Sequence, residues 1–311
     1  MSARSLSSRA IIGEFFSRLE QNVGVEYVPR ISTVPFRSDQ GSEEYRWLGM
    51  APALREWIGG RNAKGLRDTG FTIRNIKYEA TLEVSGDEIR RDKTGQVMVR
   101  VAELADRANA QWAKMLSSLI VGGEAAVCYD GQYFFDTDHA EGDSGTQSND
   151  LTYDVTTPAA PTAAEFESAV LKSVEALLGF KDDQGEPLNE GASDFVVMVP
   201  VPFMGAAAAA LKNPVIVDGS GARTNTIVNI GGFNFQLVTN PRLSWTTKFA
   251  TFRADGNVKP FIRQEEMPIQ IDAVAEGSEL EFTHDKHQYG VMAIRAAGYG
   301  MWQHAVLTTL T

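Results

Sequence analysis

GQVMVRVAELADRANAQWAKMLSSLIV, residues 95–121, is the stretch of sequence that decides the fold. Its apolar residues recur at steps of three and four, which is the spacing of one face of an α-helix. These residues are Val97, Val101, Ala105, Ala108, Trp112, Met115 and Leu119. Thr94 can cap the first turn and Gly122 and Gly123 can end the last, so the spacing predicts one helix of about 38 Å. A helix of this length with a single apolar stripe is typical of a long element packed along a sheet.

The composition is that of a globular chain with about two domains. The sequence has 311 residues, of which 43% are hydrophobic, and this is enough for a buried core in each domain. No window reaches the roughly 18 consecutive apolar residues of a membrane-spanning helix, and the first residues lack the apolar centre of a signal peptide. We therefore expect a cytoplasmic chain. The single cysteine, Cys128, excludes a disulfide within the chain and a cysteine-rich zinc site.

The net charge of −11 is unevenly distributed along the chain. Residues 1–100 carry a net charge of +3 and residues 101–311 carry −14. Residues 46–77 hold seven basic and two acidic side chains, whereas residues 121–160 hold eight acidic side chains and no lysine or arginine. Such an acidic chain is not expected to bind nucleic acid through its whole surface, because that affinity comes from lysine and arginine side chains that neutralise phosphates. The two oppositely charged segments indicate surfaces that meet, most simply between copies of the chain.

Two N-terminal segments have too little bulk to fold alone. Residues 6–19 have the pattern of an amphipathic helix, and the chain from there to residue 42 is expected to be an extended arm. The apolar face of this helix must dock on its own chain or on a neighbour, and it consists of Ile11, Ile12, Phe15, Phe16 and Leu19. Residues 43–84 follow as a long hairpin with a glycine-rich tip at 51–70 and a change of face near Asn75. The tip lacks the spacing of a phosphate-binding loop.

The rest of the chain alternates predicted helices and strands, which indicates a compact α/β unit followed by two long strands. In the helix expected at residues 162–180, Thr162 and Glu165 have the spacing of a capping box. A short helix or turn is expected at residues 86–93 and a small-residue helix at 204–212. Strands are expected at residues 127–135, 195–201, 227–230, 233–238, 249–253, 258–275 and 279–297.

The cluster most similar to a metal site is DTDHAEGD, residues 136–143. Its spacing does not fit a calcium-binding EF-hand loop, because Ala140 stands where an oxygen ligand is needed. We therefore interpret Asp136, Asp138 and His139 as structural residues of a polar turn whose carboxylates cap backbone amides. The four histidines of the chain form none of the common hydrolase or metalloprotease motifs. An enzyme is disfavoured, and no catalytic residue, cofactor or metal is expected.

Several blocks of this sequence resemble a known family. They are residues 71–95 (FTIRNIKYEATLEVSGDEIRRDKTG), 133–139 (YFFDTDH), 180–188 (FKDDQGEPL), 195–202 (FVVMVPVP) and 289–305 (YGVMAIRAAGYGMWQHA). In order and spacing they are similar to the major capsid proteins of tailed phages with the Hong Kong 97-type fold, and specifically to the Mu-like major head subunit (gpT) family. The sequence departs from the family pattern at Arg90-Arg91 and at Phe203-Met204, which affects local contacts and not the expected fold.

The resemblance implies an α+β fold with four named parts. These are an N-terminal arm (residues 1–42), an E-loop hairpin (43–78), a peripheral or P domain with the long spine helix (79–161 and 255–298), and an axial or A domain (162–254 and 299–311). It also implies a major capsid protein that assembles into hexamers and pentamers of an icosahedral shell around double-stranded DNA. The alternatives are a non-viral, encapsulin-like cage of the same fold and a metal-dependent enzyme built on Asp136, Asp138 and His139.

The implied partners are other copies of the chain, together with scaffolding, portal and decoration proteins of the phage. Packaged DNA is expected to be contacted only weakly, and no membrane partner is expected. The implied location is the virion capsid, assembled in the cytoplasm of the host bacterium. We expect the arm and the basic hairpin tip to contact other subunits, the tip against an acidic segment such as residues 121–160. The residues of these contacts are Ile11, Ile12, Phe15, Phe16, Arg55, Trp57, Arg61, Lys64 and Arg67.

Overall fold

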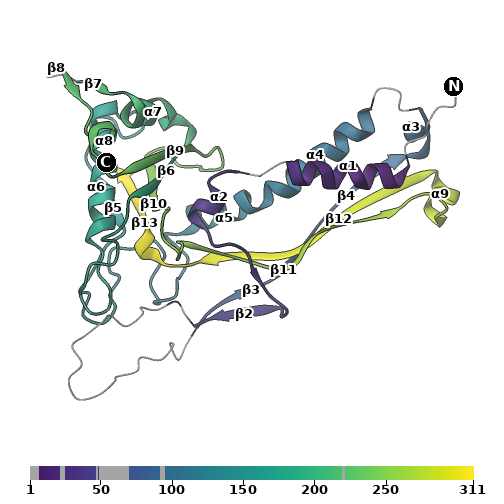
Figure 1. The fold of residues 1–311 in the computed structure, drawn as a ribbon, viewed down its shortest axis with the longest axis horizontal. Coiled ribbons are helices and arrows are strands. Elements are labelled where there is room, and N and C mark those ends of the chain that lie inside the picture. The colour runs from purple at the N-terminus through teal and green to yellow at the C-terminus, as the bar shows by residue number, and fades with distance from the viewer. Residues whose placement is uncertain (1–6, 22–24, 47, 49–69, 92–94, 219–220) are drawn as a thin grey trace, which may run out of the picture.

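The computed structural model describes residues 7–21, 25–46, 48, 70–91, 95–218 and 221–311. The molecule is elongated and has a wide half and a narrow half (Figure 1). A five-stranded sheet lies in the wide half, and the long strands of a four-stranded sheet run through the narrow half. Helices packed on these two mixed sheets confirm the expected α+β class.

The four-stranded sheet has the order β1 (Phe36–Arg37), β11 (Phe261–Val274), β12 (Lys286–Tyr299) and β4 (Ile76–Ser85). β11 and β12 confirm the two predicted long strands and pair antiparallel along their length, but the second begins at Lys286 and not at residue 279. Their register shifts on both sides of Met267, beside Pro268, because proline has no N–H to donate to the ladder. Between them lies a short helix that the sequence did not indicate, α9 (Glu279–His284).

The predicted long helix consists of two nearly continuous helices, α4 (Gln96–Asn109) and α5 (Gln111–Gly122), separated at Ala110. In α4 the buried residues Val97, Val101 and Ala105 confirm the predicted stripe. In α5 the buried apolar residues are Ala113, Leu116 and Ile120, each one position after the predicted Trp112, Met115 and Leu119. One position corresponds to a rotation of about 100°. The rotation arises because α5 packs into the core of the wide half, whereas α4 packs with α1 in a separate core.

The ends of the long helix follow the prediction in part. Gly123 occupies the C-cap position and its N–H bonds the carbonyl of Ile120, as expected for a glycine-terminated helix. At the start, Gly95 is the N-cap residue with φ 75°, a left-handed conformation that favours glycine. The predicted cap Thr94 lies outside the described residues.

The core of the narrow half lies between helices and one face of the four-stranded sheet. α1 (Ser8–Gln21) and α4 run side by side over this sheet (Figure 1). Their apolar faces meet alternate residues of the strands, including Val84, Ile271 and Tyr289. α3 (Gly86–Arg91), which confirms the expected short helix, follows β4 directly.

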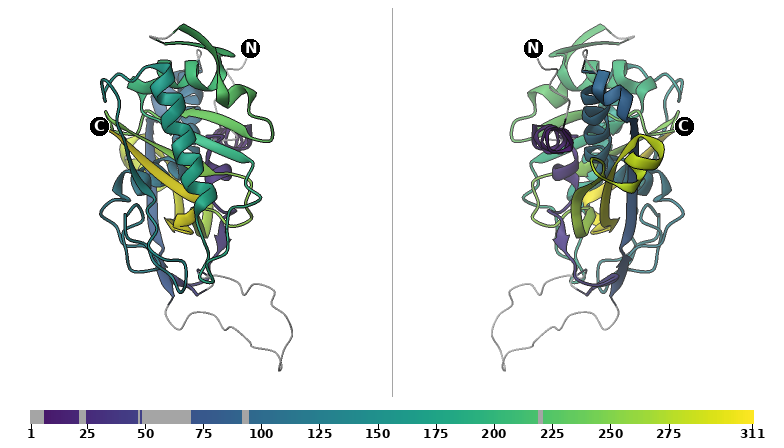
Figure 2. Two further views of the ribbon diagram at one scale, coloured as in Figure 1. Left: turned by 90° about the vertical axis from the view of Figure 1, so that its left-hand side faces the viewer. Right: turned by 90° about the vertical axis from the view of Figure 1, so that its right-hand side faces the viewer.

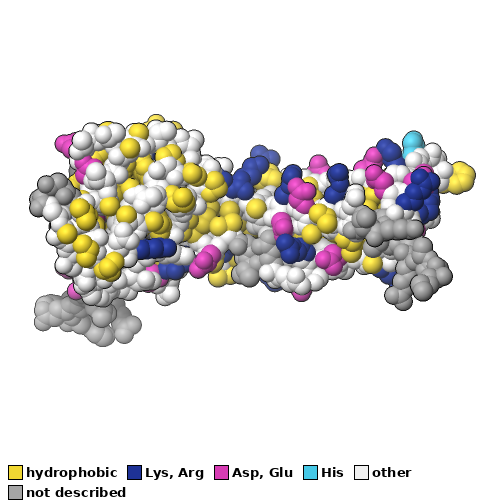
Figure 3. Space-filling model, turned by 90° about the horizontal axis from the view of Figure 1, so that it is seen from above, with side chains coloured by type: hydrophobic (Ala, Val, Ile, Leu, Met, Phe, Trp, Pro, Cys, Tyr) yellow, Lys and Arg dark blue, Asp and Glu magenta, His cyan; other side chains and the backbone are white. Residues whose placement is uncertain are grey.

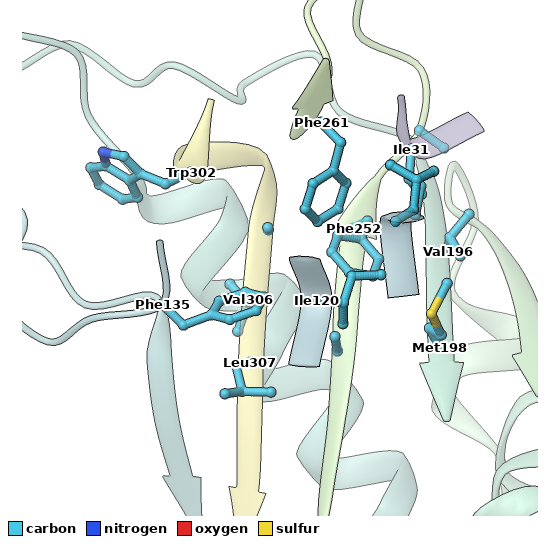
Figure 4. Packing of buried hydrophobic residues seen from close by; sticks show 14 of the residues in the cluster. Ile31, Ile120, Phe135, Val196, Met198, Phe252, Phe261, Trp302, Val306 and Leu307 are labelled. Atoms are coloured by element: carbon cyan, nitrogen blue, oxygen red, sulfur yellow. The ribbon is translucent and has the colours of Figure 1, made fainter. Parts of the chain in front are cut away.

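The five-stranded sheet has the order β5 (Asp150–Tyr153), β13 (Ala305–Leu310), β10 (Lys248–Arg253), β6 (Asp194–Val199) and β9 (Asn234–Thr239). β6 is buried on both faces, which explains its continuous apolar sequence FVVMV. Val196 and Met198 face a core shared with α5, shown in Figure 4, whereas Val197 and Val199 face a second core. Phe252, Phe261 and Trp302 are among the largest side chains of the first core.

Helices α6 (Ala163–Gly179) and α7 (Met204–Lys212) cover the second core, and α6 crosses the front of the wide half in the left view of Figure 2. The predicted capping box of α6 is confirmed. The Thr162 hydroxyl accepts a hydrogen bond from the Glu165 N–H, and the Glu165 carboxylate accepts one from the Thr162 N–H. Hydrogen bonds from Thr156, together with these bonds from Thr162, lower the pKa of Glu165 to about 2.

The base of the predicted hairpin is present as β2 (Ser42–Tyr45) paired antiparallel with β3 (Phe71–Arg74). The predicted change of face near Asn75 is confirmed, because β3 ends at Arg74 and β4 begins at Ile76. The two halves of the return strand have different partners, since β3 pairs with β2 and β4 pairs with β12. The tip at residues 51–69 lies outside the described residues.

Several local predictions are wrong. Residues 127–135 form a tight loop and not a strand, because Gly131 adopts φ 96° and the Cys128 N–H bonds the Gln132 carbonyl at 2.8 Å. Residues 227–230 fall mainly in a helical turn, α8 (Thr226–Asn229), which the side chain of Asn225 caps. The arm contains a helical turn, α2 (Val28–Ile31). The prediction also omitted four strands of the wide half: β5, β7 (Val215–Asp218), β8 (Gly221–Thr224) and β13.

The proposed division into arm, E-loop, P domain and A domain stays a prediction. β4, α4, α5, β11 and β12 belong to the segments expected for the P domain. β5 lies in those segments as well, but it pairs with β13 in the five-stranded sheet. None of the described helices is long and apolar enough to cross a membrane.

Candidate assembly surfaces

The apolar face of α1 is mostly covered by its own chain. Ile11 and Phe15 are fully buried against α4 and the four-stranded sheet. The Ser8 hydroxyl lies 3.0 Å from the Tyr289 hydroxyl, and Arg18 pairs with Asp106 of α4 at 3.2 Å. The expectation that this face docks on other subunits is therefore wrong for Ile11 and Phe15, because the chain's own core already holds them.

Two residues of this face remain accessible. Ile12 is half-buried, and the ring of Phe16 is 38% exposed at the edge of the helix. Contact of Ile12 and Phe16 with a neighbouring subunit stays a prediction. The other expected contact residues lie in the hairpin tip, outside the described residues, and their role also stays a prediction: Arg55, Trp57, Arg61, Lys64 and Arg67.

The acidic segment 121–160 offers fewer free carboxylates than its sequence suggests. Glu124 pairs with Lys248, and the side chain of Asp130 is buried beneath the turn that follows it. Asp138, Asp143 and Asp154 are exposed. The pKa of Asp138 is raised by its hydrogen bond with Asp136 and by the negative charge of that carboxylate. A cation supplied by another molecule would relieve this repulsion, which suits a surface that meets a basic partner.

His139 is the centre of the turn at residues 136–143 and is completely buried. Its Nδ1 lies 2.6 Å from Asp130 Oδ2, and its Nε2 lies 3.2 Å from Asn149 Oδ1. The orientation of the Asn149 amide is fixed, because its Nδ2 donates to the Phe134 carbonyl at 2.8 Å and its Oδ1 accepts from the Asp136 N–H at 2.9 Å. Both ring nitrogens of His139 therefore face oxygen atoms of buried side chains, Asp130 Oδ2 and Asn149 Oδ1.

Neighbouring side chains also hold the ring of His139 in place. The indole of Trp302 stacks on it with 3.9 Å between ring centroids and 10° between planes. Burial raises the pKa of Asp130, but hydrogen bonds from His139 and Cys128 outweigh burial and the net pKa is lowered. Asp130 and His139 thus form a buried hydrogen-bonded pair that joins the loop at 127–135 to the turn. Sequence reasoning found His139 but missed Asp130, Asn149 and Trp302, for which no local pattern gave a signal.

The carboxylate of Asp136 accepts hydrogen bonds from the N–H groups of Tyr133, at 3.1 Å, and Thr137, at 2.7 Å. This is the amide-capping role expected for the turn. His139 also has the structural role that we predicted, whereas Asp138 is exposed and its carboxylate bonds Asp136 and the backbone of Asp138 itself.

The ligand atoms of Cys128, Asp130 and His139 lie within 4.8 Å of one another, which is close enough to consider a metal ion. The Cys128 thiol donates to Asp130 Oδ1 at 3.0 Å, and burial raises the pKa of this thiol. A metal needs the thiolate, and structural zinc sites use four protein ligands where this cluster has three. The three side chains are instead mutually satisfied by hydrogen bonds, as expected for a structural cluster.

A second buried histidine makes stability depend on pH. Burial and the positive charge of Arg253 lower the pKa of His304 from 6.5 to about 4. Between these values the unfolded chain binds a proton that the folded chain does not, so stability falls as the pH is lowered through this window. We expect the contribution of His304 to the free energy of unfolding to fall by about 3 kcal/mol as the pH is lowered through this window.

Urea unfolding at pH 7.5 and at pH 4.5 checks this expectation. The difference in stability between the two pH values should shrink in His304→Gln, which cannot take up the proton. An equal pH dependence in the variant and the parent would contradict the assignment.

Taken together, a long helix laid along a four-stranded sheet, a hairpin base beside it and a helix-covered second sheet define the capsid-subunit class of the Hong Kong 97-type fold. Solved capsids have this architecture. The chain is similar to the procapsid of bacteriophage JBD30, with a TM-score of 0.56, 22% identity, and coverage of 98% of this chain and 76% of that one. It is also similar to the mature capsid of bacteriophage PhiM1, with a TM-score of 0.56, 11% identity, and coverage of 92% and 87%.

The chain belongs to the family of the Mu-like prophage major head subunit gpT, whose model matches residues 14–162 and 228–310. The Mu-like prophage FluMu major head subunit of Haemophilus influenzae is 37% identical over 112 residues, which is 36% of each chain. The major capsid protein of Escherichia phage Mu is 34% identical over 102 residues, which is 33% of each chain. The matched segments thus span about a third of these curated relatives. The family resemblance seen in the sequence is confirmed.

Proposed function

We propose that this protein is the major capsid subunit of a Mu-like phage or prophage, and that its copies form the hexamers and pentamers of an icosahedral shell around double-stranded DNA. The observation that carries this proposal is the family match, which coincides with a capsid-type fold over nearly the whole chain. A structural and not an enzymatic role is in keeping with the buried, hydrogen-bonded state of Cys128, Asp130 and His139.

The charge of the chain suits a shell wall. A net charge of −11 keeps packaged DNA from adhering to the wall, because nonspecific binding grows with the number of phosphates neutralised. We expect the partners to be other subunits together with scaffolding, portal and decoration proteins of the phage. The working location would be the virion, with assembly in the host cytoplasm.

Negative-stain microscopy of the purified chain tests the proposal, and uniform closed shells are the expected result. Their cargo separates the alternatives, because an encapsulin-like cage encloses protein whereas a phage head produced with its packaging proteins encloses DNA. A chain that stays monomeric at high concentration, or that carries stoichiometric metal with turnover, would contradict a capsid role.

The basic hairpin tip gives a sharper test of assembly. Reversing Arg55, Arg61, Lys64 and Arg67 to glutamate should abolish or strongly reduce shells, because the acidic surface of a neighbour would then repel the tip. The unfolding curve of the free subunit should change little, since exposed charges contribute at most about 1 kcal/mol each. Shell formation by the parent chain should also weaken with added salt, which screens charges over about 8–10 Å.

A matched control reverses four exposed basic residues elsewhere: Arg9, Lys172, Lys181 and Lys212. This variant has the same net charge as the first, so it separates a general charge effect from a contact of the tip. Equal assembly of both variants would show that the tip makes no charged contact.

A further inference from the structure

An open groove runs between the long helix and the four-stranded sheet. It has a volume of about 770 Å³ and lies where β4 and β12 pass the junction of α4 and α5. Apolar side chains from four elements line it: Tyr78, Leu82, Leu104, Ala108, Ile269 and Val291. An apolar groove of this size on a free subunit marks a contact surface.

The rim of this groove is basic. Arg100, Arg107 and Lys114 follow one another at seven-residue steps along α4 and α5, and Arg242 joins them from the loop after β9. Arg107 is paired with Glu103 at 2.6 Å. Arg100, Lys114 and Arg242 form no ion pair with another described residue. The groove therefore combines an apolar surface with positive charges that no described residue pairs.

The complementary feature lies on the same chain, at the far end of the narrow half. Phe282 of α9 is 92% exposed, and it belongs to none of the core clusters of the described residues. Glu276 and Glu279 are exposed beside it. An aromatic ring that its own fold leaves in water, next to carboxylates, has the composition of an anchor for a basic apolar groove.

The turn that presents Phe282 is well held. The Ser278 hydroxyl accepts a hydrogen bond from the Glu281 N–H at 3.2 Å, and Glu281 lies 3.0 Å from His287 Nε2. Asp285 ends the helix in a left-handed conformation with φ 49°. Because the turn is fixed, little conformational entropy is lost when its side chain enters a partner.

The turn cannot reach the groove of its own subunit. β11 and β12 hold α9 at the far end of the narrow half, away from the junction of α4 and α5 (Figure 1), and the residues around that junction line the groove. Seen from above, basic and acidic side chains alternate along the narrow half (Figure 3). A tip and a groove on one chain form a heterologous contact, which gives a closed ring when the rotation between copies closes and an open filament when it does not.

We propose that Phe282 of one copy inserts into the groove of a second copy, with its Glu279 beside Arg100 and Lys114. This inference rests on the proposed self-assembly, and it specifies the two surfaces that contact each other between subunits. Burial of the ring would remove about 150–250 Å² from water. Nucleic acid is a poorer occupant, because the floor of the groove is apolar and its lining includes Glu79 and Glu103.

Cross-linking in assembled particles tests the contact directly. The variant Leu104→Cys/Thr283→Cys keeps the Phe282 ring and places one cysteine on the exposed residue next to it. Oxidised and run on a non-reducing gel, it should give a ladder of linked subunits, because each copy contributes one tip and one groove. The control is Val99→Cys/Thr283→Cys, in which the helix cysteine replaces a side chain that is 68% exposed and does not line the groove. The native Cys128 is buried and is common to both variants.

The outcomes of this experiment are distinct. Particles that give the ladder with Leu104→Cys and not with Val99→Cys support the contact. Particles that give no ladder, or equal ladders in both variants, overturn it and leave the proposed function standing. A parent chain that forms no particles contradicts the proposed function and this contact together.

A charge exchange gives an independent measurement. Arg100→Glu/Lys114→Glu should lower the particle yield by about tenfold or more, the change that corresponds to a loss of 1.4 kcal/mol. Adding Glu279→Lys should restore part of the yield, because the interacting charges are then exchanged. No rescue would overturn the pairing, and normal shells that fail only to retain DNA would assign the groove to nucleic acid instead.

Discussion

Replacing His139 with alanine should lower the free energy of unfolding by about 3–5 kcal/mol, because Asp130 would keep a buried charge without its partner. The change would also leave the Asn149 carbonyl short of one donor and remove the ring that stacks on Trp302. The midpoint of urea unfolding, followed by tryptophan fluorescence, measures the effect.

The control for this prediction is Asp138→Asn in the same turn. Asp138 is exposed, so its substitution should change the free energy of unfolding by no more than about 0.5 kcal/mol. Asp130→Asn should be nearly as damaging as His139→Ala, because a neutral amide replaces the buried carboxylate that contacts both His139 and Cys128. Similar small effects in all three variants would mean that the hydrogen-bonded pair does not stabilise the fold.

Replacing Phe15 with alanine should cost about 3–5 kcal/mol, because its ring is fully buried between α1, α4 and the four-stranded sheet. The adjacent Phe16 provides a matched control, since its ring is partly exposed and meets Phe15 edge-on with 5.7 Å between ring centroids. We expect Phe16→Ala to cost less than about 1.5 kcal/mol, the upper value for an aromatic pair. Thermal or urea unfolding of the free subunit measures both.

This pair of variants also separates two roles for the arm helix. If Phe15→Ala leaves the subunit as stable as the parent, then α1 is not part of the subunit core. If Phe16→Ala leaves stability intact but reduces shell formation, then the exposed ring contacts a neighbour as predicted. Deletion of residues 1–24 removes both residues, so a failure of that truncation would not by itself distinguish assembly from folding.

The parts of the fold that were predicted from the sequence depend on local patterns. Three short patterns, each about ten residues long or less, predict the local structure correctly. They are the apolar stripe of α4, the capping box that begins at Thr162, and the continuous apolar run of β6. The change of face at Asn75 was equally visible, because strand residues alternate between two faces.

The errors have a common physical origin in contacts between distant segments. The stripe moved by one residue in α5 because that helix packs on a different core from α4. Short apolar runs such as residues 227–230 fit a strand or a helical turn equally well, and the cap of Asn225 decided the outcome. The burial of Ile11 and Phe15 depends on Tyr289 and Val291, more than 270 residues away in the sequence, and no spacing within the arm reveals it.

The chain order of the strands has a consequence for biosynthesis. β13 is the last described strand in the sequence, yet it lies between β5 and β10 in the five-stranded sheet. In the four-stranded sheet, β1 is near the N-terminus but can pair only after β11 has been synthesised. While the ribosome is still translating the first two-thirds of the chain, neither sheet has the strands that hold it together. Synthesis is vectorial and long-range pairing is slow, so a nascent or prematurely released chain exposes incomplete sheet edges and presents no finished subunit. Translation itself thus excludes unfinished polypeptides from a growing shell.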